Sequence, residues 1–135
     1  MYLHKNINFV NLVVNEILDR EKHQKELSQK IIKDFSKKHN INKLVVSRGN
    51  QGAILFDKNK NKFYYSDAYA NDIKDKVGAG DAMLSLISLC FASKLSNELS
   101  LFSGSLAAAQ SVETIGNKES INKNKVLKFI EHSLK

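Results

Sequence analysis

The stretch DKVGAGDAML, residues 75 to 84, places two glycines around an alanine and follows them with an aspartate and an apolar run typical of a helix. Glycines at 78 and 80 remove two Cβ atoms where this helix is expected to begin, so successive backbone N–H groups can turn toward one point. A helix N-terminus also supplies unpaired donors and about half a positive charge, and both favour an anion. The sequence therefore predicts an anion-binding loop at 78–80, with Asp81 either capping the helix or facing the bound anion.

Two other phosphate-binding motifs do not match this loop. A P-loop needs G-x-x-x-x-G-K-[ST], which occurs nowhere in the chain. The dinucleotide fingerprint G-x-G-x-x-G needs glycine or alanine where Met83 stands, and an apolar strand where the chain has NDIKDK. Both motifs are excluded.

Outward from this loop, strand and helix patterns alternate in the order of an α/β domain. Short runs rich in β-branched residues, INFVNLVVN (7 to 15) and LVVS (44 to 47), predict buried strands. Between them, apolar residues at helical spacing, such as Leu27 and Ile31, predict a helix over about 19–39 that packs along one stripe. Strand, helix and strand in this order favour a parallel pairing in an α/β sheet.

A hairpin and three helices are expected in the rest of the chain. Segments AILFD (53 to 57) and KFYYSD (62 to 67), separated by the polar KNKN, predict a β-hairpin. The helices are expected over about 79–94, 97–115 and 121–134. Ser96 and Ser120 are the expected N-caps, and Gly116 is expected to end the middle helix. Two pairs of glycines mark junctions between these elements, and the chemistry is expected there.

The composition fits one small basic domain. The chain has 135 residues, 42% of them apolar, and a net charge of +7. This charge suits a phosphate-bearing partner, whether nucleotide, nucleic acid or acidic lipid, without choosing among them. The lysines are scattered over expected helix faces and turns, as in KNKNK (58 to 62), so they predict a solvated surface. We expect no nucleic-acid partner, and a basic nucleic-acid-binding module is the less favoured alternative.

Smaller features are interpreted as structural. Cys90 is the only cysteine and lies in the apolar run LISLCFA, so it is expected in the core. The four histidines lack metal-ligand spacing. Tyrosines 64, 65 and 69 are expected to pack on the sheet, and Arg48 either contacts a phosphate or is simply exposed. No run reaches the roughly 18 to 20 apolar residues of a membrane span, and MYLHKNINFV lacks the order of a secretory signal. A cytoplasmic protein without a membrane partner is expected.

The segment DKVGAGDAMLS (75 to 85) resembles the C-terminal signature of the ribokinase-like (PfkB) carbohydrate kinases, in which an aspartate, two variable residues and Gly-Ala-Gly-Asp open a helix. The resemblance implies that Gly78, Ala79 and Gly80 form an anion hole for the transferred phosphoryl group. It also implies that Asp81 is the base that takes the proton from the acceptor hydroxyl. Asp75 matches the leading aspartate of the signature.

Three further segments carry the same resemblance. LVVSRGNQGAILF (44 to 56) is similar to the family's strand and S/T-x-G-x-x-G loop, which implies nucleotide contacts from Ser47, Gly49 and Gly52.

GSLAAAQSVETIGNKESI (104 to 121) resembles the alanine-rich helix and turn of heptose-phosphate-type sugar kinases, with Ser105 near the nucleotide base. LVVNE (12 to 16) resembles the strand ending in the N-x-x-E motif, which implies a role for Asn15 in the nucleotide site. The glutamate of that motif is replaced by Leu18, which cannot hold a hard cation, so no metal ligand is assigned.

The resemblance implies a three-layer, Rossmann-like α/β fold of the ribokinase-like type, with residues 1–135 as its C-terminal part. The sugar-binding N-terminal half and the lid have no counterpart in the chain. The implied activity is ATP-dependent phosphoryl transfer, with Mg²⁺, to a hydroxyl of a sugar or sugar phosphate. The alternative is a non-catalytic nucleotide-binding fragment, or a subunit that a second chain completes with the sugar-binding half.

Overall fold

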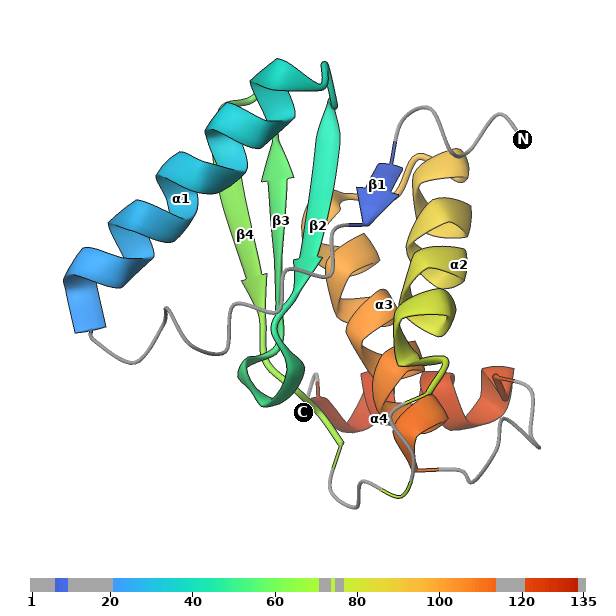
Figure 1. Ribbon diagram of the computed structural model, residues 1–135. Coiled ribbons are helices and arrows are strands. Elements are labelled where there is room, and N and C mark those ends of the chain that lie inside the picture. The colour runs from blue at the N-terminus through green and yellow to red at the C-terminus, as the bar shows by residue number, and fades with distance from the viewer. Residues whose placement is uncertain (1–6, 10–20, 71–73, 75–76, 114–120, 134–135) are drawn as a thin grey trace.

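A mixed β-sheet forms the middle of the molecule (Figure 1). The computed structural model describes residues 7–9, 21–70, 74, 77–113 and 121–133. The four strands lie in chain order and are β1 (Ile7–Phe9), β2 (Lys43–Ser47), β3 (Ala53–Asp57) and β4 (Lys62–Ser66). β1 runs parallel to β2, and the other neighbours are antiparallel. The predicted parallel pairing and the predicted hairpin are therefore confirmed, while residues 10–15 of the first expected strand lie outside the described residues.

Helices cover both faces of this sheet, which confirms the predicted three-layer α/β architecture (Figure 1). On one face lies α1 (Glu21–Lys38). On the other face lie α2 (Ala79–Ala92) and α3 (Asn97–Val112), and α4 (Lys123–Ser133) lies against the end of α3.

Two of the expected helix caps can be compared with the structure. Ser96 caps α3 as predicted, because its Oγ accepts a hydrogen bond from the Leu99 amide at 3.2 Å. The prediction of Ser120 as the cap of α4 was wrong. The helix begins at Lys123, and the Oδ1 of Asn122 accepts hydrogen bonds from the amides of Asn124 and Lys125, at 2.9 Å and 3.2 Å. Asn122 thus holds the capping position, and Ser120 and Gly116 lie outside the described residues.

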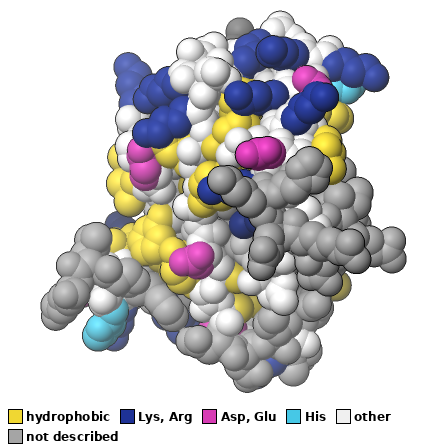
Figure 2. All heavy atoms as spheres, turned by 90° about the vertical axis from the view of Figure 1, so that its left-hand side faces the viewer, with side chains coloured by type: hydrophobic (Ala, Val, Ile, Leu, Met, Phe, Trp, Pro, Cys, Tyr) yellow, Lys and Arg dark blue, Asp and Glu magenta, His cyan; other side chains and the backbone are white. Residues whose placement is uncertain are grey.

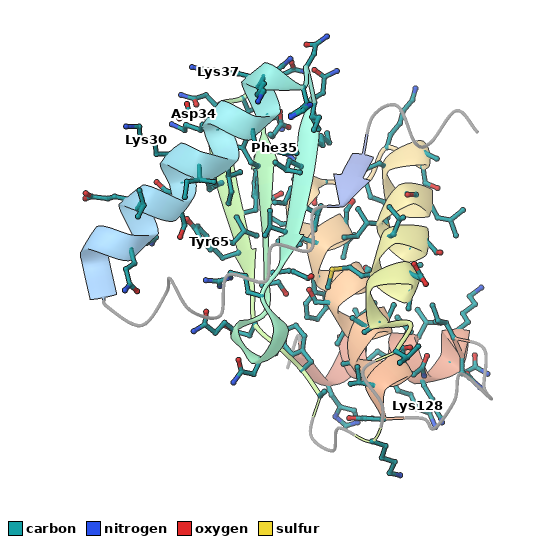
Figure 3. The ribbon with its side chains drawn as sticks, viewed as in Figure 1. Lys30, Asp34, Phe35, Lys37, Tyr65 and Lys128 are labelled. Atoms are coloured by element: carbon teal, nitrogen blue, oxygen red, sulfur yellow. The ribbon has the colours of Figure 1, made fainter. Side chains whose placement is uncertain are left out.

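The core is divided by the sheet into two clusters. Successive side chains of a strand point to opposite faces, so Val45 faces α2 and α3 while Leu44 and Val46 face α1. Figure 3 shows Phe35 of α1 turned toward the sheet, whereas Lys30 points away from it. Each large side chain that is fully buried contributes about 1.5–3 kcal/mol. β2 and β3, buried on both faces, are therefore a rigid support for the loop that joins them.

Part of the positive charge lies at one end of the molecule. Figure 2 shows lysines gathered at the end where α1 finishes and where β3 turns into β4. The lysines at this end, called here the basic end, are Lys37, Lys38, Lys58, Lys60 and Lys62. Cys90 is buried as predicted. Among the helices that the structure describes, none is both long and apolar enough to cross a membrane.

Candidate active site

Both glycine junctions lie at the same end of the sheet, opposite the basic end (Figure 1). The first junction follows the carboxyl end of β2 and contains the short 3-10 turn η2 (Gly49–Gln51). The second is the start of α2, which follows Gly78. β4 also ends here, so the chain leaves the hairpin beside the first junction and then leads to the second. The fold thus places two loops that are well separated in the sequence at the same end of the sheet.

The start of α2 offers backbone donors without helical partners. Gly78 is the N-cap residue and has a φ of +87°, a conformation that favours glycine. The first helical hydrogen bond runs from the Ala82 N–H to the Gly78 carbonyl at 2.9 Å. The N–H groups of Ala79, Gly80 and Asp81 precede that bond and have no acceptor within the helix. Together with the helix dipole, they give this point the electrostatics of an anion site.

Asp81 presents an exposed carboxylate in the same turn. Its backbone carbonyl accepts a hydrogen bond from the Ser85 Oγ at 2.8 Å, so the backbone of the residue is fixed within the helix. The capping position belongs to Gly78, which has no side chain with which to cap. Among the described residues no hydrogen bond to the Asp81 carboxylate is present. Of the two roles that the sequence left open, capping by the Asp81 side chain is not seen among the described residues, and its position facing a bound anion stays a prediction.

The segment leading to Gly78 is anchored to α3. The ring of Tyr69 meets the ring of Phe102 edge-on, with centroids 5.4 Å apart. The Lys74 N–H donates to the carbonyl of Val112 at 2.8 Å. Sheet packing was therefore the wrong expectation for Tyr69, although Tyr64 is buried in the core as expected. The sequence offered only one signal for this anchor, a single aromatic residue in the polar stretch SDAYAND (66–72).

The two glycines of the first junction differ in their surroundings. Gly49 and Gly52 both have positive φ, at +58° and +80°. A Cβ on Gly52 would lie 1.9 Å from the carbonyl oxygen of Ser66, whereas a Cβ on Gly49 would meet nothing within 4 Å. Gly52 therefore allows the loop to pack on the end of β4, while the backbone at Gly49 faces open space. Ser47, the last residue of β2, is half-buried beside them.

Arg48 closes the same loop. Its N–H donates to the Gly52 carbonyl at 2.8 Å, and its Nη2 donates to the Gln51 carbonyl at 2.7 Å. Burial lowers the pKa of Arg48, while the nearby Tyr65 and Asp67 act in the opposite direction. An arginine keeps its charge despite such a shift. The cation is therefore directed into its own loop, so simple exposure, one of the two alternatives for this residue, is not what the structure shows.

Of the remaining predicted site residues, the structure describes Ser105. Ser105 lies within α3 and is buried, and its Oγ has no hydrogen-bond partner among the described residues. Its contact with a nucleotide base stays a prediction. Asn15 and Asp75 lie outside the described residues.

The comparison with protein families decides what kind of molecule carries these loops. The sequence pattern of the pfkB family carbohydrate kinases matches residues 7–124, which include both glycine junctions and all the strands. The chain belongs to the pfkB family of carbohydrate kinases. Membership confirms the resemblance on which the predicted roles of the glycine loops rest.

Among curated proteins, this pfkB-family chain is 34% identical over 90 residues to the bifunctional protein HldE of Campylobacter fetus. The match covers 67% of the chain and 18% of HldE.

Solved structures share its fold. Phosphofructokinase-2 from Escherichia coli superposes with a TM-score of 0.76 at 20% identity, over 96% of the chain and 41% of the enzyme. A ribokinase from Thermotoga maritima superposes with a TM-score of 0.72 at 22% identity, over 93% of the chain and 42% of the enzyme. The pfkB-family chain thus spans less than half the length of these structures.

Proposed function

We propose that this pfkB-family chain is the nucleotide- and phosphoryl-binding part of a carbohydrate kinase that uses ATP to phosphorylate a hydroxyl of a sugar or sugar phosphate. The start of α2 carries the proposal, because three amides without helical partners stand beside an exposed carboxylate. Family membership supports the kinase class, and the geometry supports the division of roles within the turn.

The backbone amides and the carboxylate at the start of α2 have separate roles in the proposed phosphoryl transfer. ATP, when bound, supplies the phosphoryl group and the ADP leaving group. The amides of the predicted anion hole, Gly78, Ala79 and Gly80, together with the adjoining amide of Asp81, stabilise the negative charge on the transferred group, and one well-aimed donor of this kind contributes about 3 to 4 kcal/mol. The Asp81 carboxylate takes the proton of the acceptor hydroxyl as its oxygen bonds to phosphorus, and such a base adds roughly 10² to 10⁴ in rate. The bond from phosphorus to the ADP oxygen breaks in the same step.

The first junction completes the phosphate side of the proposed site. Ser47 and the open backbone at Gly49 would run beside the nucleotide phosphates, with Gly52 holding their loop on β4. Magnesium in such sites is held largely by phosphate oxygens and water, with one or two carboxylates. Within the part of the chain that the structure describes, no three histidine, cysteine or acidic side chains cluster. We propose that magnesium enters the site with the nucleotide phosphates, and no protein ligand is assigned to it.

The acceptor-binding half of the kinase is proposed to lie outside these 135 residues, either in the same polypeptide or in a partner chain. The short coverage of phosphofructokinase-2 and of ribokinase supports this division. β1, at one edge of the sheet, is a place where further strands can pair.

The test compares Asp81→Asn with Glu98→Gln in the chain joined to the sugar-binding half of a full-length relative. Glu98 is a matched control, because it is also an exposed acid in the first turn of a helix. Over a panel of sugars that includes a heptose phosphate, Asp81→Asn should lower ADP release at least about 100-fold. It should leave the calorimetric affinity for ATP within a few-fold, and Glu98→Gln should change neither quantity.

Unchanged turnover in Asp81→Asn would exclude Asp81 as the base. ATP binding by the unmodified protein without turnover on any sugar would favour the non-catalytic nucleotide-binding subunit instead.

A further inference from the structure

Arg48 makes hydrogen bonds within the first glycine loop. Its side chain is half-buried and reaches the Gln51 carbonyl, while its backbone N–H reaches the Gly52 carbonyl. The remaining bonds of the turn run from the Gln51 N–H to the Arg48 carbonyl at 3.1 Å and from the Gly52 N–H to the Gly49 carbonyl at 3.2 Å. Arg48 thus takes part in three of the four hydrogen bonds that close residues 48–52.

The surroundings of Arg48 extend this contact beyond the loop. Asp67, the first residue after β4, and Tyr65 within β4 are near enough to the guanidinium to oppose the lowering of the Arg48 pKa by burial. Tyr65 lies between β4 and α1 (Figure 3), where its hydroxyl accepts a hydrogen bond from Gln29 at 2.5 Å. The Lys25 ammonium lies 4.9 Å from the centre of its ring. The side chain of Arg48 is therefore placed between the loop and a strand that is itself held by α1.

Part of the guanidinium is buried without a partner. The Nε of Arg48 is inaccessible and has no hydrogen-bond partner among the described residues. A buried donor without a partner costs free energy, so this inward position is stable only if the other contacts outweigh the cost. An arginine that served only to attract phosphate would avoid that cost by extending into solvent, beside the open backbone at Gly49.

We propose that Arg48 is a positioning residue that closes the 48–52 turn and so gives the backbone around Gly49 the shape that receives the nucleotide phosphates. The closing of the turn stands on the contacts above, and its use for phosphates rests on the proposed function. The rival role is a direct phosphate ligand, which would require the guanidinium to turn outward and release the Gln51 carbonyl.

Hydrogen exchange without nucleotide tests the proposal. In Arg48→Gln the backbone amides of residue 48 and of Gly52 should exchange about tenfold faster than in the unmodified protein. This is the effect expected from the loss of one charged hydrogen bond. Arg48→Lys should restore part of the protection, since an ammonium can still donate to one carbonyl. Lys30→Gln removes the same charge from an exposed site on α1 and should change nothing. Thermal unfolding of each variant reports whether the whole fold has loosened.

Calorimetric titration with ATP separates the outcomes. Faster exchange with weaker ATP binding in Arg48→Gln, and partial recovery of both in Arg48→Lys, are the expected results. Weaker ATP binding with unchanged exchange would overturn the proposal in favour of a direct ligand, and no change in either would overturn it altogether. If the unmodified chain binds no ATP while exchange still responds to Arg48, the proposed function fails and the positioning of the turn stands. If Arg48→Gln does not fold, the test rests on amide exchange in Arg48→Lys. Unchanged protection of the turn amides in that variant, together with weaker ATP binding, would refute the proposal.

Discussion

At the scale of single residues, the first junction shows that two glycines, both with positive φ, have different tasks. Gly52 gives room for the carbonyl of Ser66, while Gly49 only needs a left-handed backbone and borders open space. A side chain in the left-handed region costs about 1–2 kcal/mol at either position. The packing cost applies only at Gly52, because the atoms it would meet belong to the backbone and cannot swing away.

We therefore predict that Gly52→Ala lowers the free energy of unfolding by about 2 to 5 kcal/mol, the sum of the conformational and overpacking costs. Gly49→Ala should lower it by only about 1–2 kcal/mol. Urea denaturation of the two variants measures the difference. Equal losses would show that Gly52 is not in contact with the end of β4.

The sequence predicted the residues of this junction but not their separate tasks. Gly49 and Gly52 were both expected beside the nucleotide, because the spacing of a motif says nothing about what lies next to each glycine. Arg48 had two open interpretations for the same reason. The contact that decides between them, from the Arg48 Nη2 to the Gln51 carbonyl, depends on the geometry of the turn, which the residue types alone do not encode.

At the scale of elements, a polar cluster fixes the start of α3 to the far end of the sheet. The carboxylate of Asp57 is almost fully buried, and accepts hydrogen bonds from Asn97 Nδ2 at 2.8 Å and from the Lys60 N–H at 3.1 Å. Lys43 Nζ donates to the Oδ1 of Asn97 at 2.5 Å. Burial alone would raise the pKa of Asp57, but the hydrogen bonds from Asn97 and Lys60, with the charge of Lys43, lower it below 3.8.

A lowered carboxylate pKa contributes stability that is present above the unfolded value and is lost as the pH falls through the folded value. We predict that the urea midpoint of the protein falls as the pH drops below 3.8, the ordinary aspartate value. Asn97→Ala should lower the free energy of unfolding at neutral pH by about 1–3 kcal/mol, because the buried Asp57 carboxylate loses a hydrogen-bond donor. It should also flatten the acid dependence. Asn42→Ala, at an exposed position, is the control. Parallel pH profiles for Asn97→Ala and the unmodified protein would contradict this role.

The contact between α2 and α3 depends on a missing side chain. A Cβ on Gly104 would lie 2.3 Å from Cγ1 and 2.6 Å from Cδ1 of Ile87, so the two helices pack closely only because position 104 is glycine. Alanine within a helix gains about 1 kcal/mol over glycine, whereas overpacking a core costs typically 1–3 kcal/mol. We expect the overpacking cost of Gly104→Ala to exceed its gain in helix propensity.

Gly104→Ala should therefore destabilise the protein, but the same change in an Ile87→Ala background should be neutral or stabilising. In that background the clashing atoms are gone and the new methyl group fills part of the cavity. A double-mutant cycle by chemical denaturation measures the reversal. Additive effects of the two changes would contradict the close contact.

Element order was predictable from the sequence because hydrophobic periodicity reports which faces are buried. The hairpin and the helices lie where their patterns placed them, with ends that differ by a few residues. The cap of α4 was predicted at the wrong residue, since Ser120 and Asn122 are both good caps and only the first helical hydrogen bonds decide between them.

At the scale of the whole molecule, the basic end and the glycine loops lie apart (Figures 1 and 2). Charges on a solvated surface are screened within about 8 Å at physiological ionic strength. The lysines of the basic end therefore contribute little to any phosphate bound at the start of α2, and the net charge of +7 does not by itself identify a binding face. That the loops share one end could not be predicted from the sequence, because it depends on the path of the chain from β4 along α3 to Gly78.

The most direct test of the central claim is a titration of the ¹⁵N-labelled chain with Mg-ATP, followed by two-dimensional NMR. If the start of α2 receives the phosphates, the largest saturable shifts will be at the amides of Ala79, Gly80 and Asp81, accompanied by Gly49. The backbone amide signals of the lysines at the basic end should shift little. Saturation with those amides unmoved, or shifts confined to the basic end, would contradict the account.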